Sequence, residues 1–188
     1  MDGEKTMRYA MIGVGLAVLW VAYLALFGPS TAGPSGLTAP DLARANGRAP
    51  ADFGWTLRDL DDKPVDFARF RGRPILLNLW ATWCPPCRAE MPALASLADD
   101  PRIKAKDVAV ICVSEEPAAT VRSYLAGRKW GMTMLRADAI PPIFATDGIP
   151  ATFLIDPAGR VVASEVGAAR WDDPSVVDFL EKLATPGR

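Results

Sequence analysis

The distribution of apolar residues divides the chain into distinct stretches. Residues 9–27 carry no charge and are almost entirely apolar, whereas residues 28–48 are rich in Gly, Pro, Ser, Thr and Ala. From residue 49 onward, short apolar runs alternate with amphipathic stretches, which is typical of a globular domain. We therefore predict a short N-terminus at 1–8, a membrane-spanning segment at 9–27, a flexible linker at 28–48 and one domain at 49–188.

The uncharged run at 9–27 predicts a membrane anchor. A helix needs about 20 apolar residues to span a bilayer, and the run exceeds the roughly 7–15-residue core of a cleavable signal peptide. Cleavage after Ser30-Thr31-Ala32 and a buried soluble helix are the alternatives. Lys5 and Arg8 precede the run, and no Lys or Arg follows it before Arg44. The positive-inside rule then predicts a single-pass protein of the cytoplasmic (inner) membrane, with a cytoplasmic N-terminus and a periplasmic, extracytoplasmic domain.

Within the domain, the apolar patterns predict alternating strands and helices. The runs at 74–80 and 108–113 are apolar at nearly every position, which is typical of strands covered on both faces. We expect further strands at 55–57, 64–67, 132–135, 152–155 and 161–164, helices at 85–99, 117–129 and 174–183, and an irregular segment with room for one helical turn at 140–146. This order predicts an α/β domain with a mixed central sheet and helices on both faces.

Composition excludes several kinds of site. The net charge of −1 gives no reason to expect a nucleic-acid partner. Histidine is absent, which excludes a His-based triad, a His zinc site and haem attachment, since Arg88 follows Cys87. Three cysteines cannot form a disulfide scaffold. They fit one working pair and a third, Cys112, which we expect to be a small buried core residue.

The working pair is Cys84 and Cys87, at the junction between an apolar strand and a helix. A cysteine at a helix N-terminus meets free backbone N–H groups and the positive end of the helix dipole, which favour the thiolate. We expect Cys84, nearer to solvent, to attack a substrate disulfide and Cys87 to resolve the mixed disulfide. Pro85 and Pro86 remove two donors, so the N–H of Cys87 should be the nearest one. An inert pair and a zinc site are the alternatives, and zinc lacks further ligands.

Two separate segments resemble the thioredoxin superfamily. Residues 79–92, LWATWCPPCRAEMP, resemble its active-site segment, most closely that of the membrane-anchored branch with TlpA, ResA and CcmG-type proteins. Residues 148–156 with Gly159 resemble its cis-proline loop and following strand. The resemblance covers about 49 to 183 and implies a thioredoxin-like fold, thiol–disulfide oxidoreductase activity and no cofactor.

The resemblance also implies which residues meet a substrate. A cis peptide between Ile149 and Pro150 would lie beside the dithiol and turn the Ile149 backbone toward an extended substrate. Trp83 would shape the docking surface, together with Pro85 and Pro86 between the cysteines. We therefore predict these five positions as substrate-binding residues.

Two further positions bear on proton transfer. Thioredoxins proper carry a buried Asp six residues before the first active-site Cys, where this chain has Asn78, which cannot exchange protons. The ResA-like branch has a Glu three residues after the second Cys, and Glu90 matches it. We hypothesise that Glu90 acts as the proton relay. The alternative is a solvated surface side chain.

The resemblance implies a reductase of specific protein disulfides, such as those of apocytochrome c or a copper-site assembly protein. Such a reductase would need a membrane electron donor of the CcdA/DsbD type, because its compartment is oxidising. Two alternatives remain open at this point. A peroxiredoxin-type thiol peroxidase expects Thr where Ala81 stands. A Cu(I) carrier of the Sco type adds a His, which is absent.

Overall fold

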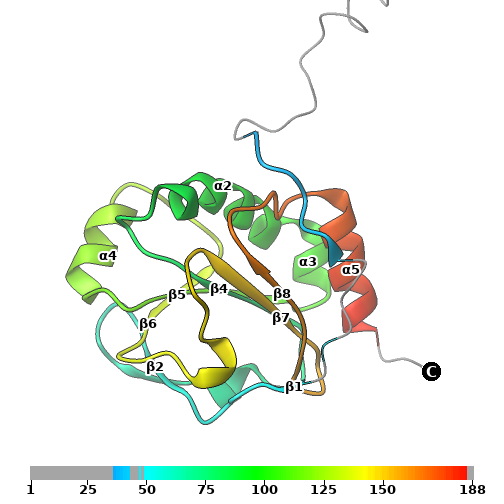
Figure 1. Cartoon of the computed structure of the whole chain (residues 1–188), viewed down its shortest axis with the longest axis horizontal. Coiled ribbons are helices and arrows are strands. Elements are labelled where there is room, and N and C mark those ends of the chain that lie inside the picture. Colours follow the sequence, from blue (N-terminus) through cyan, green and yellow to red (C-terminus); the bar gives the residue numbers. More distant parts are fainter. Residues whose placement is uncertain (1–35, 43–46, 48, 186–188) are drawn as a thin grey trace, which may run out of the picture. The chain divides into compact units, whose positions relative to one another are not determined.

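The computed structural model describes residues 36–42, 47 and 49–185, and within them one mixed eight-stranded sheet forms the centre of the domain (Figure 1). The strand order is β1-β8-β7-β4-β5-β6-β2-β3. The strands are β1 (Ala49–Pro50), β2 (Thr56–Arg58), β3 (Pro64–Asp66), β4 (Ile75–Leu79), β5 (Ala109–Ser114), β6 (Thr133–Arg136), β7 (Ala151–Ile155) and β8 (Arg160–Val166). The α-helices are α2 (Pro85–Asp99), α3 (Pro101–Ala105), α4 (Ala118–Leu125) and α5 (Pro174–Ala184), and the 3₁₀ helices are η2 (Phe67–Phe70) and η3 (Pro142–Phe144).

Strand β4 is the centre of the sheet and leads directly to the cysteine pair. It pairs in parallel with β5 and antiparallel with β7, and every residue of these three strands is buried. This confirms the expectation of fully covered strands for the runs at 74–80 and 108–113. The antiparallel register sets Leu79, the last residue of β4, opposite Ala151, the first of β7. The end of β4 and the segment preceding β7 therefore lie together.

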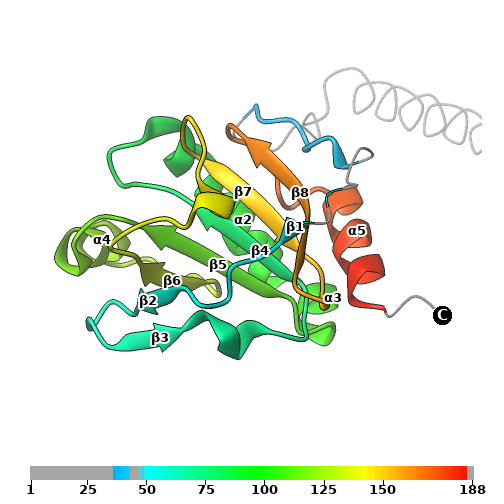
Figure 2. The same cartoon turned by 60° about the horizontal axis from the view of Figure 1, so that its bottom comes forward.

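The two faces of the sheet are covered differently. One face carries Leu76, Val110 and Leu154 and packs against residues of α2, α3, α4 and α5. The other face carries Ile75 and Ile111 and packs against aromatic residues that include those of η2 and η3. Figure 2 shows the sheet in front with the α-helices behind it. The expected mixed sheet with helices is confirmed. Among the described residues, all four α-helices pack on one face, and the other face carries only the 3₁₀ helices η2 and η3. The expectation of helices on both faces is therefore met only by these short 3₁₀ helices.

The reason for this asymmetry lies in the order of the strands. The crossovers β4–α2–β5 and β5–α4–β6 join parallel neighbours and advance in the same direction across the sheet. Two such crossovers of the usual right-handed sense place both helices on one face. The opposite face is closed by the aromatic cluster around Phe67 and Phe144, whose ring centroids lie 6.3 Å apart.

Several element boundaries differ from the prediction. The expected hairpin is present as β2 and β3, but Phe67 begins η2, because the Asp66 side chain caps that turn. Helix α3 was not expected and starts at a second cap, Asp100, followed by a proline. Helix α4 ends at Leu125, before Gly127, whose φ of +78° favours glycine.

The stretch predicted as a linker contacts the domain where it is described. The compact unit begins at Leu37. The N–H of Arg170 donates to the carbonyl of Thr38 at 2.7 Å, and the N–H of Gly47 donates to that of Val162 at 3.1 Å. A Cβ at position 47 would lie 2.7 Å from the carbonyl oxygen of Val161, so only glycine fits this approach.

The predicted membrane anchor at 9–27 lies outside the described residues. In the part of the chain that the structure describes, no helix combines the length and apolar character needed to cross a bilayer.

Candidate active site

The cysteine pair forms a disulfide at the start of α2. Cys84 and Cys87 are joined, with their Cα atoms 5.3 Å apart, and Cys84 is the N-cap of the helix. The N–H of Cys87 donates to the Sγ of Cys84 at 3.2 Å, while Pro85 and Pro86 lack this donor. The nearest backbone donor is therefore the one that the sequence indicated. Cys84 keeps 3% of its surface exposed and is less accessible than we expected, whereas Cys87 is fully buried, as expected of the resolving cysteine.

The cis-proline loop lies beside the disulfide. The Ile149–Pro150 peptide is cis, as the resemblance implied. The carbonyl oxygen of Ile149 lies 3.7 Å from the Sγ of Cys84, and the carbonyl of Pro150 accepts from the N–H of Gly167 at 2.9 Å. Within the described residues, the N–H of Ile149 makes no hydrogen bond. It is thus available to an extended partner chain.

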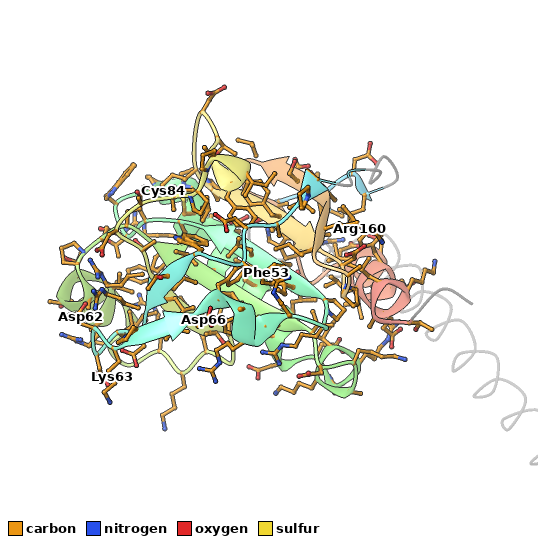
Figure 3. The ribbon with its side chains drawn as sticks, turned by 90° about the horizontal axis from the view of Figure 1, so that it is seen from below. Phe53, Asp62, Lys63, Asp66, Cys84 and Arg160 are labelled. Carbon is orange, nitrogen blue, oxygen red and sulfur yellow. A yellow bond between two sulfur atoms is a disulfide. The ribbon has the colours of Figure 1, made fainter. Side chains whose placement is uncertain are left out.

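A groove of about 380 Å³ adjoins this loop. Its lining includes Trp83, Phe144 and Ile149, with Glu115 and Asp138 among its acidic residues. Trp83 is 70% exposed, which is unusual for so large an apolar side chain. Two of the five predicted docking residues, Trp83 and Ile149, therefore border one depression. Figure 3 shows Cys84 well separated from Arg160, where β8 begins.

A carboxylate fixes the loop that leads into the cysteine pair. Glu116 accepts hydrogen bonds from the backbone N–H of Thr82 at 2.6 Å and from its hydroxyl at 2.7 Å. The hydroxyl of Ser114, at the end of β5, donates to the same carboxylate at 3.2 Å. These contacts hold the residue two positions before Cys84. The role of Glu116 was not predicted from the sequence, because no local pattern relates this residue to Thr82.

Glu90 is fully buried, so its alternative interpretation as a solvated surface residue is wrong. One carboxylate oxygen, Oε1, accepts from the Nδ2 of Asn78 at 2.8 Å. The other, Oε2, accepts from the indole N–H of Trp171 at 2.8 Å and from the N–H of Ala169 at 3.0 Å. Burial raises the pKa of Glu90, and these hydrogen bonds partly oppose the rise. Glu90 is one helical turn beyond Cys87 on α2.

No sequence pattern indicated a role for Trp171, yet the indole of this fully buried residue, in the segment between β8 and α5, donates to Glu90. A lone Trp outside any motif carries no local signal for such a contact. Trp80 and Cys112 are buried, as expected of core residues. The Sγ of Cys112 lies 3.5 Å from the Sδ of Met132. Burial, and secondarily the charge of Glu90, raise the pKa of the Cys112 thiol, which keeps it protonated.

Together these contacts describe a site for dithiol chemistry. A disulfide caps a helix, a backbone edge lies beside it, and a buried carboxylate sits one turn further along the helix. The five predicted substrate-binding positions all belong to the two segments that the register of β4 and β7 brings together. Their individual roles stay predictions.

Comparison with known proteins agrees with this geometry. The Redoxin family matches residues 34–180. The thiol-disulfide oxidoreductase ResA of Geobacillus thermodenitrificans is 30% identical over 190 residues, which cover 96% of this chain and 98% of that protein. ResA of Bacillus anthracis is also 30% identical, over 60% of this chain, and this shorter match spans 66% of that protein.

Solved structures extend the similarity to the fold. A Bacteroides vulgatus protein described as a thiol-disulfide oxidoreductase superposes with a TM-score of 0.63 at 26% identity, over 75% of this chain and 99% of that one. A Chlorobium tepidum protein described as the thiol:disulfide interchange protein DsbE gives a TM-score of 0.60 at 25% identity, over 73% and 94% of the two chains. With its cysteine pair, its cis-proline loop and these relatives, the chain belongs to the Redoxin family of the thioredoxin superfamily and is a ResA/CcmG-like thiol–disulfide oxidoreductase.

Proposed function

We propose that this protein is a membrane-anchored, extracytoplasmic reductase of specific protein disulfides. The observation that carries the proposal is the position of the Cys84–Cys87 disulfide, in which the Sγ of Cys84 lies 3.7 Å from the carbonyl oxygen of Ile149. A substrate segment that pairs with the free N–H of Ile149 would pass directly over Cys84. The groove beside Trp83 would receive the side chains that flank the substrate cysteine.

The reaction transfers two electrons from the reduced dithiol to the substrate. The Cys84 thiolate attacks one sulfur of the substrate disulfide, which forms a mixed disulfide and releases the first substrate thiolate. The Cys87 thiolate then attacks the Sγ of Cys84 and displaces the second substrate thiolate. The product is the Cys84–Cys87 disulfide, the state that the structure holds.

Glu90 would take up the proton that Cys87 must lose before its attack. A carboxyl whose pKa is raised by burial lies closer to that of a thiol, and this improves proton transfer between the two groups. Asn78, at the position of the buried Asp of thioredoxins proper, cannot do this. Glu90 on α2 is therefore the carboxylate that we assign to the relay.

The compartment and the partners follow from the N-terminal pattern and from the resemblance. The uncharged run at 9–27, with Lys5 and Arg8 before it, supports an anchor that places the domain outside the cytoplasm. In an oxidising compartment, a reductase needs electrons from a membrane donor, which we propose to be of the CcdA/DsbD type. Apocytochrome c and copper-site assembly proteins are the substrates that we propose.

Trapping of mixed disulfides tests the proposal. In the full chain, Cys87→Ala removes the resolving thiol, so Cys84 should accumulate in disulfides with its substrates. The matched control is Cys84→Ala, which keeps Cys87 and Cys112 but lacks the attacking thiol. We expect trapped partners with the first variant and none with the second. Equal trapping by both variants would contradict the assignment of Cys84 as the nucleophile.

The direction of electron flow needs its own measurement. The reduced full chain should reduce insulin disulfides, and its Cys84→Ala variant should not. Equilibration with glutathione buffers then gives the reduction potential, where about 30 mV corresponds to 1.4 kcal/mol. A potential more oxidising than that of protein disulfide isomerase, about −180 mV, would instead favour an oxidase.

A further inference from the structure

The buried amide of Asn78 has one atom without a partner. Its Nδ2 donates both to Oε1 of Glu90 and to the hydroxyl oxygen of Thr152, at 2.8 Å each. Its Oδ1 is buried and accepts no hydrogen bond from any described residue. An unpaired buried acceptor costs free energy, so it calls for an explanation. An amide that serves two protonation states of Glu90 would keep one of its two polar atoms without a partner in each state.

The register of the sheet fixes the neighbours of this amide. Asn78 on β4 lies opposite Thr152 on β7 and opposite Cys112 on β5. An amide that turns over about its last side-chain bond exchanges the places of Oδ1 and Nδ2. Oδ1 would then face Oε1 of Glu90 and the hydroxyl of Thr152. A protonated carboxyl and a hydroxyl can both donate to it.

We propose that Asn78 and Thr152 form a reversible hydrogen-bonding partner for Glu90. The Asn78 amide donates to Oε1 while Glu90 is ionised and, turned over, accepts from Oε1 once that oxygen carries a proton. Thr152 changes from acceptor to donor in the same step. Only one proton moves, from the Cys87 thiol to Oε1, and the amide and hydroxyl merely rotate. The inference rests on the proposed function, in which Glu90 exchanges a proton with the dithiol.

The contacts of the other oxygen decide where the proton goes. Oε2 accepts from the indole N–H of Trp171 and from the backbone N–H of Ala169, and both of these groups can only donate. A proton on Oε2 would compete with both donors. Oε1 instead faces an amide that has an acceptor to offer. Trp171 is therefore a positioning residue, which keeps Oε2 deprotonated and turns Oε1 toward Asn78.

Few other ionisable groups surround this carboxyl. Strands β4 and β7 contribute only neutral side chains. Strand β5 contributes Cys112, and α2 contributes Cys87, which does not titrate while it is in the disulfide. In the segment before α5, the guanidinium of Arg170 binds the carboxylate of Asp173. In the oxidised protein, a titration sensed by the Asn78 amide should therefore report Glu90.

Nuclear magnetic resonance of the oxidised full chain in detergent micelles tests this inference. We expect the side-chain NH₂ signals of Asn78 to move with pH at the same midpoint as the carboxyl carbon of Glu90. In Glu90→Gln, the new amide resembles a protonated carboxyl in size and as a donor, so the Asn78 signals should stay at their low-pH positions. Asn78 signals that stay constant while Glu90 titrates would overturn the proposal.

Two variants separate a reversible partner from a simple donor. Trp171→Phe removes a donor that favours the ionised form, so it should shift the Glu90 midpoint upward. Asn78→Leu removes a partner of both forms, so its shift should be smaller. An upward shift in Asn78→Leu as large as that in Trp171→Phe would show that Asn78 is only a donor and would overturn the proposal.

This test is independent of the test of function, because it needs neither a substrate nor exchange activity. Asn78 signals that follow Glu90, with no partner trapped by Cys87→Ala, would overturn the proposed function and support the hydrogen-bonding pair. Trapped partners with constant Asn78 signals would support the proposed function and overturn the hydrogen-bonding pair.

Discussion

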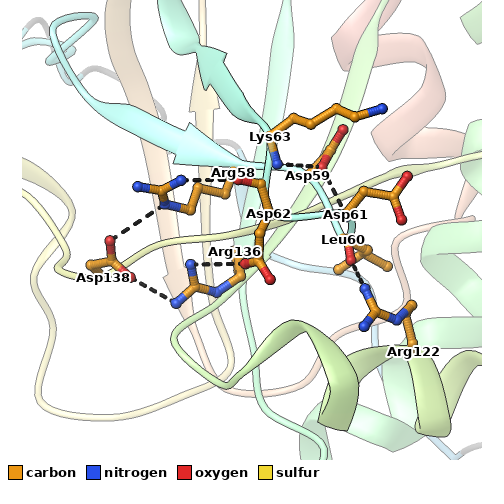
Figure 4. A network of polar contacts seen from close by, with 9 residues as sticks. All are labelled: Arg58, Asp59, Leu60, Asp61, Asp62, Lys63, Arg122, Arg136 and Asp138. Carbon is orange, nitrogen blue, oxygen red and sulfur yellow. Dashed lines mark hydrogen bonds and ion pairs between the residues drawn. The ribbon is translucent and has the colours of Figure 1, made fainter.

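Two polar clusters of this domain differ in the burial of their carboxylates. In the first, Glu90 is fully buried and accepts three hydrogen bonds from neutral donors. In the second, Arg136 binds Asp62 at 3.4 Å and Asp138 at 2.7 Å, next to the β2–β3 turn (Figure 4). The side chains of Asp62 and Asp138 are 60% and 70% exposed.

The oppositely charged groups lie in the cluster whose carboxylates are exposed to water. The buried carboxylate of Glu90 has no cation among its hydrogen-bond partners. Water screens the Arg136 pairs, so each contributes little to stability. Burial instead raises the pKa of Glu90, because dipoles replace its hydration only in part. A carboxylate held without a counter-charge remains ready to take up a proton. The comparison thus separates a surface cluster of ion pairs from a buried carboxylate whose raised pKa suits the proton relay that we propose.

Of the substitutions in the two clusters, Trp171→Ala should cause the largest change in the free energy of unfolding. The substitution empties a fully buried site and removes a donor to Glu90, so we expect a loss of about 3–5 kcal/mol in the free energy of unfolding. Urea denaturation measures it. The matched control is Trp83→Ala, since Trp83 is 70% exposed and its loss should leave the free energy nearly unchanged. Equal losses in both variants would contradict the structural role of Trp171.

Glu90→Gln should change how stability depends on pH. The pKa of Glu90 lies above its usual 4.5, so between 4.5 and the raised pKa the native state binds more protons than the unfolded state. Wild-type stability must therefore fall as pH rises through that interval, by up to about 1.4 kcal/mol per pH unit. Gln does not titrate and should lack this component. Denaturation curves at a series of pH values test it, and a constant difference between the two proteins would refute it.

The smallest effect should come from the exposed cluster. Asp138→Asn removes one carboxylate from Arg136 and from Arg58, whose Nε lies 3.7 Å away. We expect a change below about 1 kcal/mol in the free energy of unfolding, shrinking further as salt is added. Thermal denaturation at low and high ionic strength measures both. A larger loss of unfolding free energy that did not depend on salt would show that the ion pairs of Arg136 behave like buried contacts, contrary to this prediction.

Much of this domain was predicted from the sequence, because the start and end of most helices and strands depend on residues that are neighbours in the chain. Helix α2 has the predicted bounds, since Cys84 and Pro85 mark its start and the capping Asp100 ends it. The apolar runs predicted β4 and β5 to within one residue. Helix α3 was missed because its five residues are too few to show a periodicity.

In the site, too, the features within contiguous motifs were predicted and the contacts between distant residues were not. The cysteine pair and the cis-proline loop lie in contiguous motifs, so they could be recognised. The contacts of Trp171 with Glu90 and of Glu116 with Thr82 join residues 81 and 34 positions apart. Only the folded chain brings such residues together. The orphaned Oδ1 of Asn78 likewise has no signature in the sequence.

The 3% exposure of Cys84 has a consequence for the partners of this enzyme. A sulfur so recessed cannot meet a disulfide held flat on the surface of a rigid domain. It is reached by a segment that can extend across the Ile149 backbone, as chains do before they have folded or where they stay locally unfolded. For the reductase that we propose, such an entrance would select substrates by their flexibility, and folded proteins nearby would keep their disulfides.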